Sequence, residues 1–398
     1  MAQRRRRFGT LLAIAALGAC EQAEKLEDRF RDLTPYEAYQ EKLAAAGLDS
    51  TALAMDWAAA GREAVEEPIT VDLPFEEEGY ITAEAPVAVG YRVHIPRGRK
   101  LTFGVYLETD DGTRLFLDLF RVPSNEEDPL RPVFSSDSVG GIFEHEDPWR
   151  AGDYVLRLQP ELLRGGTYRV VLTQEAQFAF PVEGSSMSAI LSVFGAPRDG
   201  GRRVHHGVDI FARRGTPVLA ATAGTTYRVN DTNIGGKVVW VRDEEREARF
   251  YYAHLDSQYV GNGVRVEVGD TIGFVGNTGN ARTTHPHLHF GVYRRPGGPF
   301  DPYPFLDPPR RALPEMTADL ALLGGHVLPS NEGIRLRASP GTRSDVVMEL
   351  EAGASLRVLG ASGGWYRVQL PDGRRGYVAA RLMQAEVALA EDGGGSGG

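Results

Sequence analysis

The chain has 398 residues, 42% of them hydrophobic and 25% charged, which is typical of globular proteins. This length exceeds one ordinary core and predicts two to four domains of roughly 100–200 residues each. The net charge of −10 argues against nucleic-acid binding, which requires lysine and arginine to neutralise phosphates. The 47 glycines and 24 prolines indicate many turns and a β-rich architecture.

Residues 1–19 have the pattern of a lipoprotein signal peptide. Arginines at 4–7 precede an apolar stretch, residues 8–19, which is shorter than the roughly 20 residues that a membrane-spanning helix needs. The stretch ends in Leu-Gly-Ala before Cys20 and resembles the bacterial lipobox, in which the cysteine is acylated; the alternative is an ordinary signal peptide followed by a chance cysteine. Cleavage there would remove four arginines and leave a net charge of −14. We expect acyl chains on Cys20, the only cysteine, to hold the protein at a membrane surface, and no intramolecular disulfide forms.

The next two segments differ in their periodicity. Residues 20–67 are rich in Ala, Glu, Lys and Leu and predict a helical stalk, with Thr34 before Pro35 as a favourable helix start. Residues 68–180 predict a β-sandwich accessory domain, because short alternating apolar runs recur between turn signals. These runs are residues 91–95, 101–107, 115–120, 154–158 and 168–172.

The C-terminal part begins with a proline-containing linker, residues 306–325. Residues 326–384 closely resemble the bacterial SH3-like domain, with a Ser-Pro-Gly turn, a Gly-Trp-Tyr strand and an Asp-Gly hairpin in the right order. Trp365 and Tyr366 either form an aromatic ligand patch or fill the small barrel. The glycine-rich residues 385–398 predict a disordered tail. The fold class expected is therefore mainly β and multidomain.

Residues 185–305 contain an unusual cluster of histidines. Six of the nine histidines lie between His205 and His289, where random placement would put about two. A metal site is the commonest cause of such clustering. If residues 204–210 form a strand, its alternation places His205 and Asp209 on one face, with Gly207 between them. In the same way His287 and His289 share a face, while the apolar residues between and after them point into a core.

These residue types suit Zn²⁺, which binds imidazole nitrogen and carboxylate oxygen. Three protein ligands leave a fourth tetrahedral position for water, which is the catalytic arrangement. A structural zinc site would favour cysteine, and this domain has none.

The motif order His-x-Gly-x-Asp and then His-x-His resembles the lysostaphin-type zinc endopeptidases, which cut peptide bridges in bacterial peptidoglycan. The motifs Tyr-Ala-His-Leu at 252–255 and the glycine-rich stretch 273–279 agree with that family. The resemblance covers about residues 185–305. It implies that His205, Asp209 and His289 bind zinc. It also implies that His254 and His287 flank the metal-bound water, one as proton acceptor and the other as oxyanion stabiliser, in an order left open.

Three neighbouring positions need separate interpretation. The family usually has Gly-Pro before His-Leu-His, whereas this chain has His285 before the proline. We expect His285 to be a rim residue of the cleft without a metal role. His206 faces away from His205 in a strand and is expected in a core or second-sheet position. Tyr252 shares a face with His254 in this pattern, and it either lines the cleft or packs in the core.

The function expected is a zinc-dependent endopeptidase that hydrolyses peptidoglycan cross-links or stem peptides. The lipid anchor implies a bacterial cell-envelope lipoprotein that faces the periplasm or the cell surface. Two alternatives are a non-catalytic activator of cell-wall hydrolases and a metallopeptidase that acts on peptides outside the wall. The expected partners are peptidoglycan and, through Cys20, the membrane.

Overall fold

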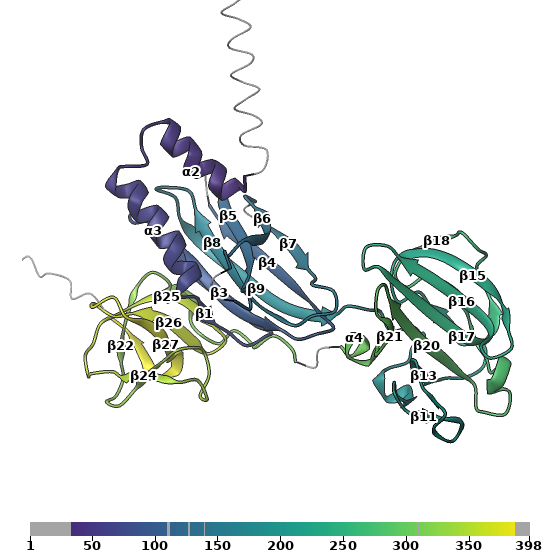
Figure 1. The fold of residues 1–398 in the computed structure, drawn as a ribbon. Coiled ribbons are helices and arrows are strands. Elements are labelled where there is room, and N and C mark those ends of the chain that lie inside the picture. Colours follow the sequence, from purple (N-terminus) through teal and green to yellow (C-terminus); the bar gives the residue numbers. More distant parts are fainter. Residues whose placement is uncertain (1–32, 110–111, 126–127, 139, 309–310, 387–398) are drawn as a thin grey trace, which may run out of the picture.

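The computed structural model describes residues 33–386, except 110–111, 126–127, 139 and 309–310. Two N-terminal helices are followed by three β units, with a third, short helix between β units (Figure 1). The expected signal peptide, Cys20 and all but the start of the expected C-terminal tail lie outside the described residues. Within the described ranges, no helix is long and apolar enough to span a bilayer.

The helices are α2 (Pro35–Ala45) and α3 (Ala52–Glu66), and each begins at a threonine. The Thr34 side chain accepts a hydrogen bond from the Glu37 backbone N–H at 3.2 Å. The Glu37 carboxylate in turn accepts from the Thr34 backbone N–H at 2.8 Å. These reciprocal bonds form a capping box, which explains why the chain becomes helical at this point.

Both helices pack against the sandwich. Trp57 is 1% exposed, stacks on Tyr36 with ring centroids 4.7 Å apart and donates from Nε1 to the Pro160 carbonyl at 2.8 Å. Phe116 completes this aromatic cluster from the outer face of the sandwich. The expectation of a helical stalk is therefore wrong for residues 33–67, because these buried rings attach the helices to the sandwich.

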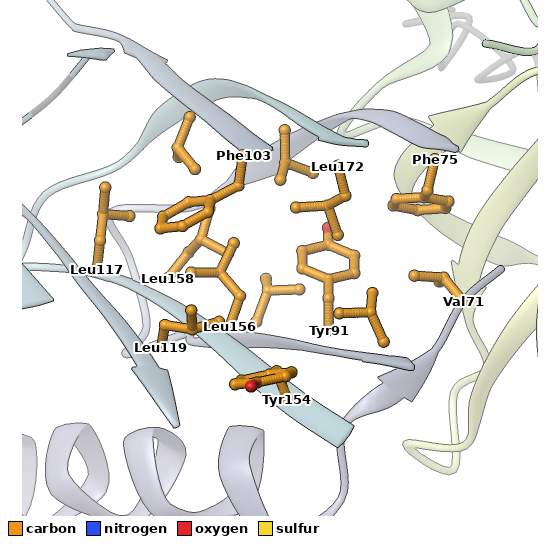
Figure 2. Close-up of a cluster of buried hydrophobic side chains, with 14 of the residues drawn as sticks. Val71, Phe75, Tyr91, Phe103, Leu117, Leu119, Tyr154, Leu156, Leu158 and Leu172 are labelled. Atoms are coloured by element: carbon orange, nitrogen blue, oxygen red, sulfur yellow. The ribbon is translucent and has the colours of Figure 1, made fainter. Parts of the chain in front are cut away.

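The sandwich consists of two antiparallel sheets, apart from one parallel pair between β1 and β3. One sheet has the order β1-β3-β8-β5-β6, and β2, β9, β4 and β7 are neighbours in the other. Figure 2 shows side chains such as Tyr91, Phe103, Leu156 and Leu172 meeting between the sheets. All five predicted apolar runs lie within strands of this unit. The strands are β1 (Ile69–Thr70), β2 (Phe75–Ile81), β3 (Val89–Ile95), β4 (Arg99–Glu108), β5 (Leu115–Arg121), β6 (Pro132–Ser136), β7 (Gly140–His145), β8 (Gly152–Pro160) and β9 (Gly166–Ala176).

The second unit contains six of the nine histidines and is built on a sheet of order β10-β13-β20-β17-β16-β15-β18. Strands β14 and β19 pair with each other beside this sheet, and β21 pairs with β20. A short helix, α4 (Tyr303–Leu306), follows β21 and lies between this unit and the end of the sandwich (Figure 1). The strands are β10 (Ile190–Ser192), β11 (Pro197–Arg198), β12 (Arg203–Val204), β13 (Val208–Phe211), β14 (Pro217–Leu219), β15 (Gly224–Thr232), β16 (Gly236–Asp243), β17 (Ala248–Gln258), β18 (Arg265–Val266), β19 (Thr271–Val275), β20 (His287–Arg294) and β21 (Gly298–Phe300).

The third unit is a small barrel that shares a sheet with the sandwich, since β25 pairs with β2. A buried ion pair crosses this junction: Arg367 Nε donates to Glu77 Oε1 at 3.0 Å. The hydroxyls of Tyr91, Tyr168 and Tyr377 donate to the same carboxylate at 2.6–2.7 Å. The strands are β22 (His326–Pro329), β23 (Arg335–Arg337), β24 (Val346–Glu349), β25 (Leu356–Ser362), β26 (Trp365–Gln369), β27 (Arg375–Ala379) and β28 (Met383–Ala385).

Candidate metal centre

Strand register brings the predicted ligands together. Asp209 on β13 pairs directly with His289 on β20, and His289 also pairs with Ala253 on β17. His205 approaches from the short connection between β12 and β13, so it does not share a strand with Asp209 as the alternation argument assumed. Gly207 lies in that connection, and a Cβ there would clash with the Phe290 carbonyl of β20. A residue without a side chain is therefore needed for the two segments to come this close.

Three donor atoms converge at this point. His205 Nε2, Asp209 Oδ1 and His289 Nδ1 lie 2.9 Å from one another in all three pairs. His205 Nδ1 lies 2.9 Å from the Val193 carbonyl, which only accepts hydrogen bonds, so Nδ1 carries the proton of the neutral ring. The Nε2 lone pair of His205 then faces Asp209 Oδ1 and His289 Nδ1, which also carry lone pairs. Because lone pairs repel one another, a cation bound between the three atoms would stabilise this arrangement.

The other oxygen of Asp209 is held by Arg198. Arg198 Nη2 donates to Asp209 Oδ2 at 2.6 Å and to the Ser192 hydroxyl at 2.7 Å. Burial alone would raise the pKa of Asp209, but the contacts with His205 and His289 outweigh it and hold that pKa well below its usual range. Asp209 is therefore an anion, and Arg198 orients it so that Oδ1 points at the two imidazoles.

His254 stands beside the three donors in a strained backbone conformation. Its φ is 63°, which is the left-handed region that non-glycine residues rarely adopt. The strain coincides with a β-bulge, since Lys237 pairs with Leu255 but Val239 pairs with Tyr252, and β17 thus has one extra residue here. The Gly235 carbonyl fixes this bend by accepting the His254 backbone N–H at 2.7 Å.

The ring of His254 is held in one tautomer. His254 Nδ1 donates to the Thr278 carbonyl at 3.0 Å, which leaves Nε2 as an acceptor. Burial, followed by the charge of His289, lowers the pKa of His254 to about 4. The imidazole is therefore neutral at pH 7 and able to accept a proton.

His287 has a matching arrangement on β20. Its Nδ1 donates to the His285 carbonyl at 2.8 Å, so its Nε2 is also an acceptor. The rings of His287 and His254 lie 5.1 Å apart, and that of His254 lies 5.9 Å from His289. Two imidazoles, each held by a backbone carbonyl at Nδ1, thus stand beside the cluster of donor atoms.

The structure places three other predicted positions differently. Tyr252 is fully buried and accepts the Ala221 backbone N–H at 2.9 Å, so it packs in the core. The bulge shifts the alternation by one residue, and Tyr251 takes the cleft position instead. His285 is exposed outside the residues that line the cleft, and it contributes its carbonyl to His287. His206 is exposed and lines the cleft, which corrects the core position expected from strand alternation, because it precedes the strand.

The centre opens into a cleft of about 880 Å³. All the described residues that line it lie between 191 and 293, so neither the sandwich nor the small barrel covers it. Sequence reasoning missed Arg198, Trp240, Tyr251 and Tyr293. Arg198 lies on β11, a strand of only two residues that shows no periodic pattern, and the three aromatic residues become neighbours only through strand pairing.

Comparison with known proteins gives two domain matches. Peptidase family M23 matches residues 203–302, and the bacterial SH3 domain matches residues 332–384. These matches cover the unit that contains the metal centre and the small barrel that follows it. The chain therefore contains a Peptidase family M23 domain and a bacterial SH3 domain.

Individual relatives match the same region. The L-Ala–D-Glu endopeptidase of Bacillus subtilis is 36% identical over 141 residues, 33% of this chain and 43% of that protein. A peptidoglycan DD-endopeptidase of Vibrio cholerae is 35% identical over 105 residues, 25% of this chain and 24% of that protein. A solved zinc-containing peptidase from Vibrio cholerae is 30% identical and covers 34% of this chain and 41% of its own, with a TM-score of 0.30. The chain thus spans less than half the length of these curated relatives.

Proposed function

We propose that this protein is a zinc-dependent endopeptidase that hydrolyses peptide bonds in peptidoglycan cross-links or stem peptides. The observation that carries the proposal is the convergence of His205, Asp209 and His289 beside two imidazoles that backbone carbonyls orient in an open cleft. A purely structural metal site would be closed by protein ligands and would not need such acceptors.

The donor set fits zinc. Two imidazole nitrogens and one carboxylate oxygen, all within 4.8 Å of one another, are ligands that Zn²⁺ prefers, and three protein ligands are typical of catalytic sites. His205 and Asp209 each have a supporting contact, to the Val193 carbonyl and to Arg198, which is typical of metal ligands in proteins. When bound, zinc acts as a Lewis acid that lowers the pKa of water and polarises a carbonyl group.

The remaining chemistry belongs to His254 and His287. Each ring donates from Nδ1 to a backbone carbonyl and presents Nε2 as an acceptor. One of them accepts a proton from the attacking water and returns it to the leaving amine. The other takes up a proton from solvent at Nε2 and then donates a hydrogen bond to the scissile carbonyl oxygen, where negative charge develops.

The substrate proposal rests on the relatives and on the domain combination. The two curated relatives named above are endopeptidases, and one is named for peptidoglycan. Their names specify different bonds, so the proposal covers cross-links and stem peptides alike. A bacterial SH3 domain beside the peptidase agrees with binding to a wall polymer. We further propose that acylated Cys20 holds the protein at the bacterial cell envelope, facing the periplasm or the cell surface.

The test compares zinc content and digestion of purified sacculi for the wild type, His289→Ala and His254→Ala. His289→Ala should lose both metal and activity, because it removes one of three ligands. His254→Ala should keep zinc and lose about 100-fold or more in rate, because it removes only a proton-transfer group. His94→Ala, a surface histidine of the sandwich with a 63% exposed side chain, is the matched control and should change neither property.

Each failure has a distinct meaning. A folded wild-type protein that binds no zinc would favour a non-catalytic activator of wall hydrolases. A zinc-loaded protein that cleaves peptides but releases nothing from sacculi would favour a substrate outside the wall. Equal zinc loss in His254→Ala and His289→Ala would refute the assignment of roles.

A further inference from the structure

A row of aromatic side chains continues from the metal centre across the open face of the sheet. This aromatic row consists of Tyr227, Trp240, Tyr251 and Tyr293. Strand register aligns three of them, since Tyr227 pairs with Trp240 and Trp240 pairs with Tyr251. The Trp240 ring lies 4.4 Å from Tyr251, 5.3 Å from Tyr293 and 6.0 Å from Tyr227, measured between centroids. Tyr251 connects the row to the metal centre, with its ring 5.8 Å from that of His289.

The aromatic row faces the cleft. Trp240, Tyr251 and Tyr293 all line it, and each is only partly buried. Apolar rings gathered on an accessible concave surface are characteristic of ligand-binding sites. The fold does not need them as core, because residues such as Val239, Val241 and Phe250 fill the interior on the opposite side of the same strands.

Three arginines extend this surface beyond the rings. The guanidinium carbons of Arg228, Arg242 and Arg249 lie 5.9, 5.2 and 6.0 Å from the centroid of the Tyr227 ring. Arg242 has one exposed carboxylate neighbour, Glu244 at 3.7 Å, while no ion pair forms at Arg228 or Arg249 among the residues that the structure describes. The chain as a whole carries a net charge of −10, so this arginine cluster is a local exception that favours an anionic ligand.

The two chemistries together define the occupant. The C–H face of a sugar ring packs well on an aromatic ring, and guanidinium groups bind carboxylates through paired hydrogen bonds. A free peptide would use only the arginine cluster, and a neutral glycan only the aromatic row. A sugar that carries an acidic peptide uses both parts.

We propose that the aromatic row and the arginine cluster form a subsite for an acidic glycopeptide, with its sugar on Trp240 and its carboxylates on the arginines. This inference rests on the proposed peptidase function and adds the part of the substrate that the enzyme selects. The centroid steps from His289 to Tyr251 and on to Trp240 are 5.8 and 4.4 Å, so the sugar lies within about 10 Å of the centre. An extended peptide covers that distance in about three residues, so the cleaved bond lies close to the sugar.

The test uses the full-length, zinc-loaded protein and two substrates with the same peptide. One is the disaccharide-linked peptide prepared from sacculi, and the other is that peptide after an amidase has removed the sugars. The wild type should prefer the glycopeptide by about tenfold in kcat/KM, equivalent to 1.4 kcal/mol. Trp240→Ala should lower kcat/KM for the glycopeptide about tenfold more than for the free peptide. Arg242→Gln should raise KM for the glycopeptide and reduce its dependence on salt.

Matched controls lie on the same domain outside the cleft. Tyr259 is 68% exposed, and the Arg265 side chain is 86% exposed. Tyr259→Ala and Arg265→Gln should keep the wild-type preference. Because Arg242 is exposed, Arg242→Gln should fold normally, and its KM and salt dependence test the subsite if Trp240→Ala fails to fold or to bind zinc.

Equal kcat/KM for both substrates in the wild type would overturn the inference and leave the peptidase proposal intact. A preference that persists unchanged in Trp240→Ala, together with a glycopeptide KM that Arg242→Gln leaves unchanged, would do the same. Cleavage of neither substrate by the zinc-loaded protein would instead refute the proposed function, and this inference with it.

Discussion

The junction between the sandwich and the SH3 domain should be a large stabilising element, and Arg367→Met tests this. Arg367 and Glu77 have side chains that are 7% and 0% exposed, and no other cation is hydrogen-bonded to the Glu77 carboxylate in the described structure. Removing one partner of a buried ion pair costs about 3–5 kcal/mol, because the other charge remains in a medium that solvates it poorly. The tyrosine hydroxyls still donate to Glu77 in this variant, so we expect the lower part of that range.

The assay is urea unfolding followed by circular dichroism. A double-mutant cycle with Glu77→Leu isolates the contribution of the ion pair. The loss in free energy of unfolding for the double variant should be at least about 2 kcal/mol smaller than the sum of the losses for the two single variants, because the double variant leaves no unpaired charge. Arg335→Met is the matched control, since its contact with Glu349, at 3.6 Å, is exposed, and it should leave stability unchanged. A cost below about 1 kcal/mol for Arg367→Met, or additive single variants, would refute the reasoning.

Three further predictions concern the peptidase domain. Gly207→Ala should abolish zinc binding, measured by metal analysis, because the new Cβ clashes with the Phe290 carbonyl; retained zinc would contradict this. Tyr252→Phe should cost about 1–2 kcal/mol in urea unfolding, because the Ala221 N–H loses its partner, and it should leave activity intact. If Tyr252→Phe lost activity while its stability stayed normal, this prediction would be wrong, and Tyr252 would act in the cleft. In the metal-free protein, burial lowers the pKa of His254 from 6.5 to about 4. The unfolded chain therefore binds more protons between these values, and stability falls by up to about 3 kcal/mol as pH drops through this range. His254→Gln should flatten this part of the stability curve, and an unchanged slope would contradict the assignment.

Motif spacing was enough to predict which histidines and which carboxylate come together in the structure. The candidates His205, Asp209, His254, His287 and His289 all line the same cleft. Alternation in β20 was predicted correctly, because that strand is regular and both of its faces are clearly marked by His and apolar residues. Alternation failed in β17, where the bulge at His254 moves Tyr252 into the core and Tyr251 into the cleft. A bulge of this kind depends on pairing with two other strands, so no local pattern reveals it.

In the helical segment too, the sequence predicted the local structure but not its tertiary packing. Composition and the threonine cap determined that residues 35–66 form helices. Their location against the sandwich depends on the packing of Trp57 and Tyr36 against Phe116, which is far away in the sequence. Likewise the SH3 motif was recognisable from its turns, whereas its fusion to the sandwich through β2 and β25 was not.

What the sequence by itself determined are features with short-range causes: strand and helix type, turn chemistry, and a motif whose ligands recur at fixed spacing. Only the tertiary structure decided which side chains from separate strands become neighbours. The Arg198 contact to Asp209, the aromatic row and the buried Glu77–Arg367 pair all belong to this second kind. They arise because register and domain packing bring together residues between which the sequence shows no periodic relation.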